Sequence, residues 1–274
     1  MHARQGTTAT VWVVNGGAIS RRSLARLLAR SGFVAANEEA AELLRAAAGD
    51  GVLLRQMLER RLTGEPLPWV TGSTTFAGIT LRVCPGVYVP RWQTGPLALA
   101  AAALLPARGT GVDLCTGSGA VAAVMRRHRP QARVLATESD QAACACARAN
   151  GFDIEVYEGD LDEPLPAELR GRVDVVAVVA PYVPSREIQF LPRDVRLYEP
   201  HAALDGGEDG LCVLRRAVDA AGRLLAPGGH FLTELGGAQD DMLATGLARA
   251  GLEVVDRLVD DEGDLRGLVT RKAL

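Results

Sequence analysis

The sequence predicts an α/β fold in which a seven-stranded, doubly wound sheet follows a small helical N-terminal domain and a connecting β-hairpin. Three observations carry this prediction. The chain has 274 residues, more than one typical small domain. The first part of the chain shows helical periodicity alone, whereas apolar strands alternate with helical stretches from Thr110 onward. We therefore expect a helical domain over residues 1–70, the hairpin over 71–90 and the sheet domain over 91–274.

The N-terminal region is expected to be helical after a loose lead-in. Residues 1–18 show no sustained hydrophobic period. Apolar side chains then recur at three- and four-residue steps over 23–31 and 37–62, which is typical of amphipathic helices. Asn37 is the expected N-cap of the second stretch, because two glutamates follow it in a first turn where the helix dipole favours acidic side chains.

A break and a hairpin lead into the expected sheet. Residues 64–68 contain two prolines and end the helical pattern, and the stretches 74–76 and 79–83 alternate around Ala77-Gly78. A helix is expected over 96–105. The predicted strands are 112–115, 132–138, 154–158, 173–179 and 230–235, followed by an antiparallel pair at 252–259 and 266–271. The run 173–180 is almost continuously apolar, as in a central strand buried on both faces.

Composition excludes several classes of function. A net charge of -3 gives no broad cationic surface, so direct binding to nucleic-acid phosphates is not expected. No apolar run approaches the roughly 20 residues that cross a bilayer, and no membrane association is expected. The five cysteines lack paired CxxC spacing, and His201 and His230 lack ligand spacing. We therefore expect reduced thiols, no metal site and a cytoplasmic protein.

A candidate ligand site begins where the predicted strand 112–115 ends. The strand runs into Thr116-Gly117-Ser118-Gly119, a loop that opens a helix, and glycine lets a ligand approach the backbone closely. Loops at the carboxyl ends of such strands are where ligands bind. Glu138 ends the next strand, where a carboxylate can accept hydrogen bonds from both hydroxyls of a ribose. The pattern predicts a nucleoside site, with a tight turn that binds nothing as the alternative.

The identity of that nucleoside follows from the residues around the glycines. Cys115 stands where a dinucleotide-binding loop has its first glycine, and residues 121–123 offer no third one. Asp113 would repel a pyrophosphate, but its carboxylate can accept hydrogen bonds from the ammonium group of a methionine moiety. The pattern therefore favours S-adenosylmethionine over a nicotinamide dinucleotide.

The motifs resemble those of a known family. The glycine loop, the segment 174–184 and the run from Tyr198-Glu199-Pro200 to Asp209-Gly210-Leu211 are similar to the protein-glutamine N-methyltransferases, the HemK-type modifiers of release factors and ribosomal proteins. The likeness covers nearly the whole chain, from residues 64–67 to Glu234. It implies a class I methyltransferase (Rossmann-like) domain, a helical N-terminal domain that recognises the substrate, and S-adenosylmethionine as cofactor.

The resemblance also implies roles for single residues. The methionine part of the cofactor would lie at Asp113, Thr116, Gly117 and Gly119, the ribose at Glu138 and the adenine side at Asp160. Their neighbours Cys115, Ser139 and Leu161 complete the expected site. Arg91 and Thr94 match the family's Pro-Arg-Pro-Glu-Thr element, and are expected in the cofactor site too, whereas Trp92 and Gln93 depart from it.

The expected catalytic segment departs from the family's signature, and the loss of the asparagine is the departure that bears on the chemistry. The family's Asn-Pro-Pro-Tyr signature reads Val179-Ala180-Pro181-Tyr182 here. In the family, the asparagine oxygen and the next backbone carbonyl accept the two hydrogens of the substrate amide and orient it. Val179 cannot accept a hydrogen bond, so a bound glutamine would keep one N–H unpaired, at a cost of about 1 to 3 kcal/mol. Either the nucleophile is not a primary amide or activity has decayed; a third reading is that Val179 merely extends the strand.

Several functions stay open at this point. The preferred one is an S-adenosylmethionine-dependent methyltransferase that acts on a release factor or ribosomal protein. The alternatives are a relative that modifies a small molecule in specialised metabolism, and a non-catalytic cofactor-binding protein. Tyr182 is expected either to pack over a planar substrate group or to cap the strand end, and Glu234 to be either a base or a surface carboxylate.

Overall fold

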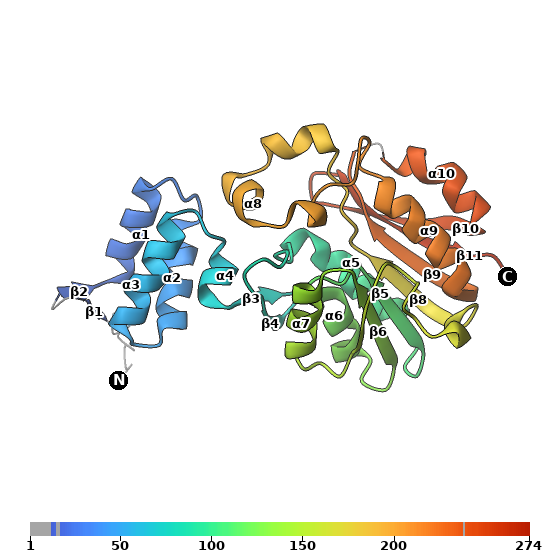
Figure 1. The fold of residues 1–274 in the computed structure, drawn as a ribbon, viewed down its shortest axis with the longest axis horizontal. Helices are drawn as coiled ribbons and strands as arrows, with labels where there is room; N and C mark the ends of the chain where they lie inside the picture. The colour runs from blue at the N-terminus through green and yellow to red at the C-terminus, as the bar shows by residue number, and fades with distance from the viewer. Residues whose placement is uncertain (1–11, 15–16, 238) are drawn as a thin grey trace, which may run out of the picture. The chain divides into compact units, whose positions relative to one another are not determined.

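The computed structural model describes residues 12–14, 17–237 and 239–274. The chain divides into two compact units, Met1–Gly72 and Ser73–Leu274. The first unit holds the helices of the N-terminal region, and the hairpin that the sequence places between domains groups with the sheet in the second unit. Figure 1 draws both units along the chain. No helix in the described part of the chain is long and apolar enough to cross a bilayer.

The first unit combines a short strand pair with four helices. Strands β1 (Trp12–Val14) and β2 (Gly17–Ile19) pair antiparallel, so the described part of the expected lead-in has regular structure. Residues 1–11, 15 and 16 lie outside the described residues. The helices are α1 (Arg21–Arg30), α2 (Ala36–Ala47), α3 (Gly51–Leu62) and α4 (Leu67–Thr71).

The expected stretch 37–62 is thus two helices, and its predicted N-cap is wrong. Helix α2 already begins at Ala36, and its cap position, Ala35, makes no side-chain hydrogen bond. Asn37 therefore lies inside the first turn. The break between the helices falls where Ala48 adopts a left-handed φ of 47° and Asp50 caps α3, accepting hydrogen bonds from two backbone N–H groups of its first turn. The hydrophobic period continues across this break, which is why it did not mark the boundary.

A buried ion pair crosses the core of the first unit. The guanidinium of Arg61 donates to both carboxylate oxygens of Glu39, at 2.7 and 2.9 Å, and lies 4.1 Å from the centroid of the Phe33 ring. Both charged side chains are nearly inaccessible. Each would be costly to bury alone, so the bidentate geometry ties α2 to α3.

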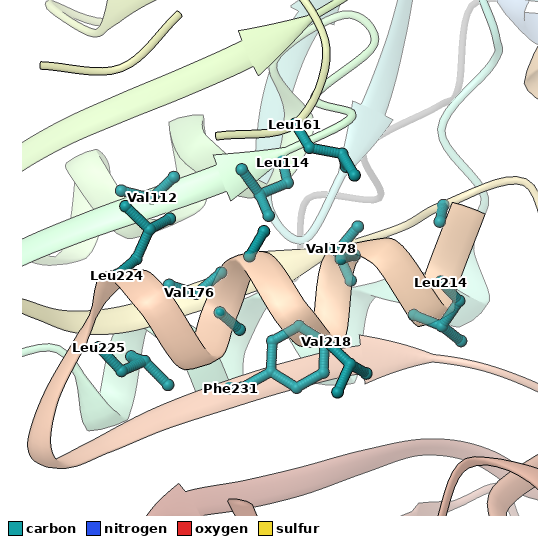
Figure 2. Packing of buried hydrophobic residues seen from close by; sticks show 14 of the residues in the cluster. Val112, Leu114, Leu161, Val176, Val178, Leu214, Val218, Leu224, Leu225 and Phe231 are labelled. Atoms are coloured by element: carbon teal, nitrogen blue, oxygen red, sulfur yellow. The ribbon is translucent and has the colours of Figure 1, made fainter. Parts of the chain in front are cut away.

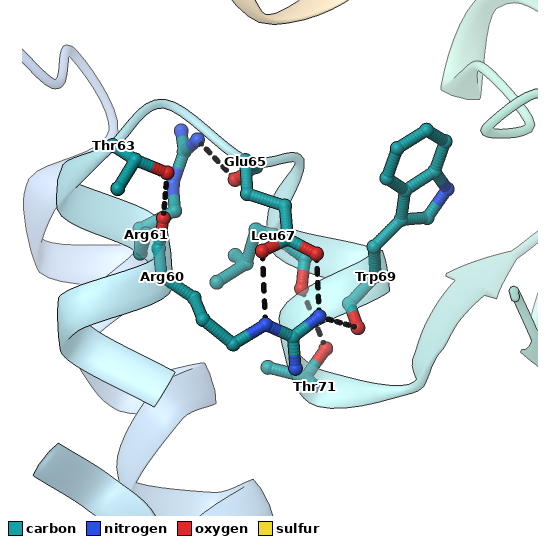
Figure 3. A network of polar contacts seen from close by, with 7 residues as sticks. All are labelled: Arg60, Arg61, Thr63, Glu65, Leu67, Trp69 and Thr71. Atoms are coloured by element: carbon teal, nitrogen blue, oxygen red, sulfur yellow. Dashed lines mark hydrogen bonds and ion pairs between the residues drawn. The ribbon is translucent and has the colours of Figure 1, made fainter. Parts of the chain in front are cut away.

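Figure 3 shows how the chain turns after α3. Arg60 donates to Glu65 at 2.9 Å through Nε and to the carbonyl of Trp69 at 3.1 Å, and Arg61 donates to the carbonyl of Glu65 at 2.8 Å. The predicted break at 64–68 is therefore a tightly bonded turn. It leads directly into α4, a short helix that the two prolines concealed in the sequence.

The second unit opens with the expected hairpin. Strands β3 (Ser73–Phe76) and β4 (Ile79–Arg82) pair antiparallel around Ala77 and Gly78, whose φ angles of 44° and 80° suit a two-residue turn. The Asn150 side chain fastens this hairpin to the sheet domain, since it accepts a hydrogen bond from the N–H of Arg82 at 2.7 Å and donates to its carbonyl at 3.1 Å.

The main sheet has seven strands, as predicted. Their order is β10-β11-β9-β8-β5-β6-β7, with β5 to β9 parallel and β11 antiparallel to both neighbours. The bounds are β5 Thr110–Leu114, β6 Arg133–Glu138, β7 Glu155–Glu158, β8 Val173–Val178, β9 Leu225–Glu234, β10 Leu252–Val259 and β11 Leu265–Lys272. The prediction of a doubly wound sheet with a terminal antiparallel pair is confirmed.

Helices of the second unit cover both faces of this sheet. They are η1 (Trp92–Thr94), α5 (Gly95–Leu104), α6 (Ala120–His128), α7 (Gln141–Ala149), η2 (Ala167–Leu169), η3 (Ser185–Phe190), α8 (Arg193–Tyr198), η4 (His201–Ala203), α9 (Cys212–Leu224) and α10 (Gln239–Arg249). Buried side chains of α9 and α10 form one hydrophobic core with the sheet, and those of α5 and α6 form another. Figure 2 shows Val218 of α9 beside Phe231 of β9 in the first of these.

Strand β8 contributes to both cores, which fixes its place at the centre. Val176 and Val178 pack in the core on the α9 side, and Val175 and Ala177 in the core on the α5 side. The near-continuous apolar run in the sequence is explained by this burial on two faces. The strand ends at Val178, one residue earlier than predicted, so Val179 follows it and does not belong to it.

Candidate active site

A cavity of about 600 Å³ lies at the carboxyl ends of the parallel strands. Strands β5 and β8 are adjacent, and their following helices cover opposite faces, so the cavity sits where the strand order reverses. All of the expected site residues except Gly119 line it: Arg91, Thr94, Asp113, Cys115, Thr116, Gly117, Glu138, Ser139, Asp160, Leu161, Val179, Ala180, Pro181 and Tyr182.

The glycine loop has a conformation that few residues adopt. Cys115, Gly117 and Gly119 have φ angles of 55°, 56° and 85°. A Cβ at Gly117 would meet no atom within 4 Å, so the backbone there borders open space. A Cβ at Gly119 would lie 3.3 Å from the Cβ of Ala147. Gly119 therefore allows α6 to pack closely against α7, and its place is outside the cavity lining.

Asp113 stabilises the glycine loop through hydrogen bonds. Its side chain is 1% exposed, and its Oδ2 accepts hydrogen bonds from the hydroxyl of Thr116 at 2.5 Å and the N–H of Ala122 at 3.0 Å. Burial raises the pKa of the carboxyl to about 7, against the two hydrogen bonds, which lower it. Asp113 thus borders the cavity as a carboxyl group whose charge is sensitive to its surroundings.

Glu138 reaches across the loop from the end of β6. Its Oε2 accepts a hydrogen bond from the N–H of Gly117 at 2.9 Å and its Oε1 one from the N–H of Asp140 at 3.0 Å. These bonds orient both oxygens at the cavity wall. The hydroxyl of Ser139, exposed beside it, lies 3.4 Å from Oε1.

The residues that follow β7 line the cavity with one charged and one apolar side chain. Asp160 forms an ion pair with Arg216 of α9, which also lines the cavity. Leu161 is buried, with a φ of 46° that turns its side chain into the core under the α9 side. Arg216 was not among the predicted residues, because its partner lies 56 positions away and no local motif links them.

Val179, which replaces the asparagine of the signature, lies at the cavity wall. Val179 is half-buried, and it packs against the core on the α5 side while lining the cavity. The following segment is held by backbone contacts: the carbonyl of Tyr182 accepts from Gln239 at 3.1 Å. A Cβ at Gly210 would approach that same carbonyl to 2.2 Å, so a glycine is required there.

Glu234 is a buried carboxylate and not a surface one. Only 6% of the residue is exposed, and it ends β9 beside the cavity. Its Oε2 accepts from the hydroxyl of Thr94 at 2.5 Å, and its Oε1 from the hydroxyl of Tyr182 at 3.0 Å. Burial raises the pKa of Glu234, and the two hydrogen bonds oppose the rise.

A second, part-buried ion pair lies at this end of the cavity. Arg91 donates to Oε1 of Glu199 at 2.6 Å, and its guanidinium lies 4.8 Å from the centroid of the Tyr88 ring. Burial raises the pKa of Tyr88 to about 12, so its hydroxyl stays protonated. Glu199 belongs to one of the motifs in the sequence, but no role was predicted for it, because its partner lies 108 residues earlier.

The residues present fit a nucleoside with a cationic amino-acid tail. Carboxyl groups stand at the ends of three neighbouring strands, and the backbone at Gly117 is open to a ligand. Among the described residues, the buried hydroxyls of Ser118 and Thr137 have no hydrogen-bond partner, and both border the cavity. Buried polar groups normally have partners, so this set is suited to a polar ligand.

Comparison with known proteins assigns the chain to a family. Residues 79–187 match the model of the methyltransferase small domain. A release factor glutamine methyltransferase of Geobacter sulfurreducens is 35% identical over 201 residues, which cover 72% of this chain and 70% of that protein. The chain belongs to the release factor glutamine methyltransferase family. The predicted family and enzyme class, an S-adenosylmethionine-dependent methyltransferase, are confirmed.

Other relatives of this chain are named for different substrates. A release factor glutamine methyltransferase of Mycolicibacterium smegmatis is 43% identical over 62% of this chain and 61% of its own length. A 4-amino-L-phenylalanine/4-methylamino-L-phenylalanine methyltransferase of Streptomyces pristinaespiralis is 41% identical over 66% of this chain and 65% of its own length. The chain thus spans less than two thirds of both relatives.

A solved structure shares the fold of a large part of the chain. A ribosomal protein L11 methylase of Lactobacillus delbrueckii subsp. bulgaricus superposes with a TM-score of 0.51 at 17% identity, over 71% of this chain and 86% of that one. The class I methyltransferase fold expected for this family is confirmed.

Proposed function

We propose that the second unit binds S-adenosylmethionine in the cavity and methylates a nitrogen atom presented at residues 179–182. Glu138 would hold the ribose and Asp160 and Leu161 the adenine side, while Asp113 and the glycine loop would face the methionine part. When bound, the cofactor supplies an electrophilic methyl group on a sulfonium sulfur. The observation that carries this proposal is the set of strand-end carboxylates around an open glycine loop.

The acceptor is an amine nitrogen in this proposal and not a primary amide. An amide nitrogen has a delocalised lone pair and must be oriented through both of its N–H groups. The carbonyl of Ala180 can accept one of them, but the valine side chain at position 179 has no acceptor for the other. An amine nitrogen, even one bonded to an aromatic ring, delocalises its lone pair less than an amide nitrogen does, so it needs less orientation before an in-line attack.

The composition of the cavity and one relative support this choice. The cavity wall includes the apolar side chains of Val179, Pro181, Val195 and Leu204. Such a wall excludes water and suits an aromatic or aliphatic body attached to the amine. The Streptomyces relative, 41% identical, is named for methylation of 4-amino-L-phenylalanine, an aromatic amine. A small arylamine is therefore the acceptor class that we propose.

A glutamine side chain of a release factor is the second candidate. Relatives with 35–43% identity carry that name, and Pro181 and Tyr182 keep the second half of the family's signature. In this reading the helical first unit would recognise the protein substrate. The two candidates differ in one physical requirement, an acceptor at position 179.

The test restores that acceptor. Wild type and Val179→Asn are assayed with S-adenosylmethionine and two acceptors, 4-amino-L-phenylalanine and a glutamine-bearing release-factor fragment, with mass spectrometry as readout. We expect wild type to methylate the amine, and Val179→Asn to gain activity on glutamine by about a hundredfold, the typical effect of one transition-state hydrogen bond. Val213→Asn, which places the same amide on the α9 side of the cavity, is the matched control.

Other outcomes would decide against parts of the proposal. If wild type already methylates glutamine as fast as Val179→Asn does, the amine assignment is wrong and the release factor is the substrate. If calorimetric titration with S-adenosylmethionine gives no heat, the chain is not an active methyltransferase at all. The two failures are separate, because the second needs no acceptor.

A further inference from the structure

A carboxylate already stands at the end of the cavity where the signature lacks its amide. Glu234 and Val179 both line this cavity, and Tyr182, three residues after Val179, donates its hydroxyl to Glu234 Oε1 at 3.0 Å. The other cavity-lining carboxyl groups in the described chain lie within or just after the carboxyl ends of strands β5, β6 and β7; they are Asp113, Glu138, Asp140 and Asp160. Glu234 ends β9, on the other side of β8.

The carboxylate has unused capacity for hydrogen bonds. Each oxygen of an ionised carboxyl group can accept about two bonds. Among the described residues, Thr94 donates to one oxygen of Glu234 and Tyr182 to the other, which leaves each oxygen a lone pair for a further donor. Because two separate elements fix its donors, the carboxylate has a single orientation. A ligand N–H arriving from the cavity would meet an acceptor that is already positioned.

The charges around Glu234 allow it to exist as an anion. Arg91 and Arg266 lower its pKa, while the protonated hydroxyls of Thr94 and Tyr182 also favour the charged form. Tyr88 also lines the cavity and stays neutral, and Glu199, whose charge raises the pKa of Tyr88, is paired with Arg91. Burial acts in the opposite direction and is the largest influence. The group is therefore a stronger base than an exposed glutamate.

We propose that Glu234 is the general base of the reaction and takes the place of the missing amide at position 179. Its free lone pair accepts a hydrogen bond from an N–H of the acceptor amine and directs the nitrogen lone pair toward the methyl carbon. The nitrogen–carbon bond forms as the carbon–sulfur bond breaks, and its electron pair stays on sulfur. The proton of the resulting ammonium passes to a Glu234 oxygen. This role rests on the proposed function.

The pH dependence of methyl transfer distinguishes a base from a structural carboxylate. With 4-amino-L-phenylalanine as probe and S-adenosylmethionine saturating, kcat of wild type should rise with pH along one limb, centred above the ordinary glutamate pKa of 4.5. Glu234→Gln keeps the size of the side chain; its oxygen can accept from one of the two hydroxyls of Thr94 and Tyr182, and its amide N–H can donate to the other. It should lower kcat by about a hundredfold or more and abolish the limb. Affinity for S-adenosylmethionine and the melting temperature should stay unchanged.

A second variant tests the same role without removing the carboxylate. Tyr182→Phe deletes a hydrogen bond that favours the charged form of Glu234, so the acidic limb should move to higher pH. A carboxylate that only packs would not move the limb in this way. Glu253→Gln, an exposed glutamate on β10, is the matched control and should reproduce the wild-type profile.

Two results would overturn the role of Glu234. One is a Glu234→Gln enzyme that keeps the acidic limb, because the limb would then belong to the free amine or to another group. The other is a limb that stays fixed in Tyr182→Phe. If wild type binds S-adenosylmethionine but does not methylate the amine, the proposed acceptor is wrong, and the role of Glu234 is wrong with it. If wild type does methylate the amine, either of the two results above counts against the role of Glu234 alone.

Discussion

At the scale of single residues, burial gives the carboxyl groups of the cavity different properties. Asp113 is 1% exposed, and burial raises its pKa to about 7. Glu138 is only half-buried and accepts backbone hydrogen bonds at both oxygens. The two residues belong to neighbouring strand ends and differ in burial and in hydrogen-bond partners, and burial brings the pKa of Asp113 close to neutral pH.

This difference predicts a pH-dependent affinity for the cofactor. A cationic methionine tail favours ionised Asp113, so binding should strengthen as pH rises through 7, the pKa of the free site. If only the ionised form binds, affinity at pH 8 should exceed that at pH 6 by about tenfold. Calorimetric titration at the two pH values measures the ratio.

Asp113→Asn is the matching variant for that prediction. An asparagine oxygen can still accept from Thr116 and Ala122, so the loop should keep its conformation. Affinity should fall and its pH dependence disappear. An unchanged tenfold ratio in Asp113→Asn would assign the titration to another group.

At the scale of elements, caps explain where the helices of the first unit begin. Asp50 accepts from the N–H groups of Val52 at 2.8 Å and Leu53 at 3.0 Å, whereas Ala35 caps α2 without a side-chain bond. An N-cap oxygen satisfies donors that the first helical turn leaves unpaired. Helix α3 is therefore fixed at its first residue by a side chain, and α2 is not.

Removing the cap should destabilise the first unit measurably. Asp50→Ala should cost about 1 kcal/mol of unfolding free energy, and Asp50→Asn, which keeps an oxygen acceptor, much less. Ala35→Ser should act in the opposite direction by supplying α2 with a cap. Urea unfolding followed by circular dichroism measures all three. Equal stabilities of Asp50→Ala and Asp50→Asn would show that the cap bond contributes nothing.

At the scale of the whole molecule, the candidate site belongs to one unit alone. Every residue that lines the cavity lies between Phe76 and Arg266, within the unit Ser73–Leu274. That unit also has its own two hydrophobic cores, on the two faces of its sheet. The first unit has a separate core of its own.

This division predicts that cofactor binding survives removal of the first unit. Residues 73–274 expressed alone should fold and bind S-adenosylmethionine with an affinity within about threefold of the full chain, since context effects of that size are typical for a preserved site. Calorimetric titration of both proteins is the measurement. A loss of binding with intact far-ultraviolet circular dichroism would mean that the first unit contributes to the cofactor site.

The sequence by itself determined the sheet and the glycine loop, because both depend on local patterns. Apolar runs predict strands at 112–115 and 132–138. Gly117 and Glu138 were identified as site residues because they lie where those predicted strands end. Asn37 was misplaced as a cap because a hydrophobic period tolerates small shifts at its ends. Element boundaries are set by hydrogen bonds that a period does not contain.

Only the tertiary structure decided the partners of the buried charges. Glu234 reads in the sequence as a base or a surface carboxylate, and it becomes a buried acceptor only when Thr94 and Tyr182 arrive from 140 and 52 residues away. Arg91 meets Glu199 across 108 residues in the same manner. A buried charge is costly unless it is paired, so the folded structure brings such groups together. Their spacing along the sequence does not indicate which group pairs with which.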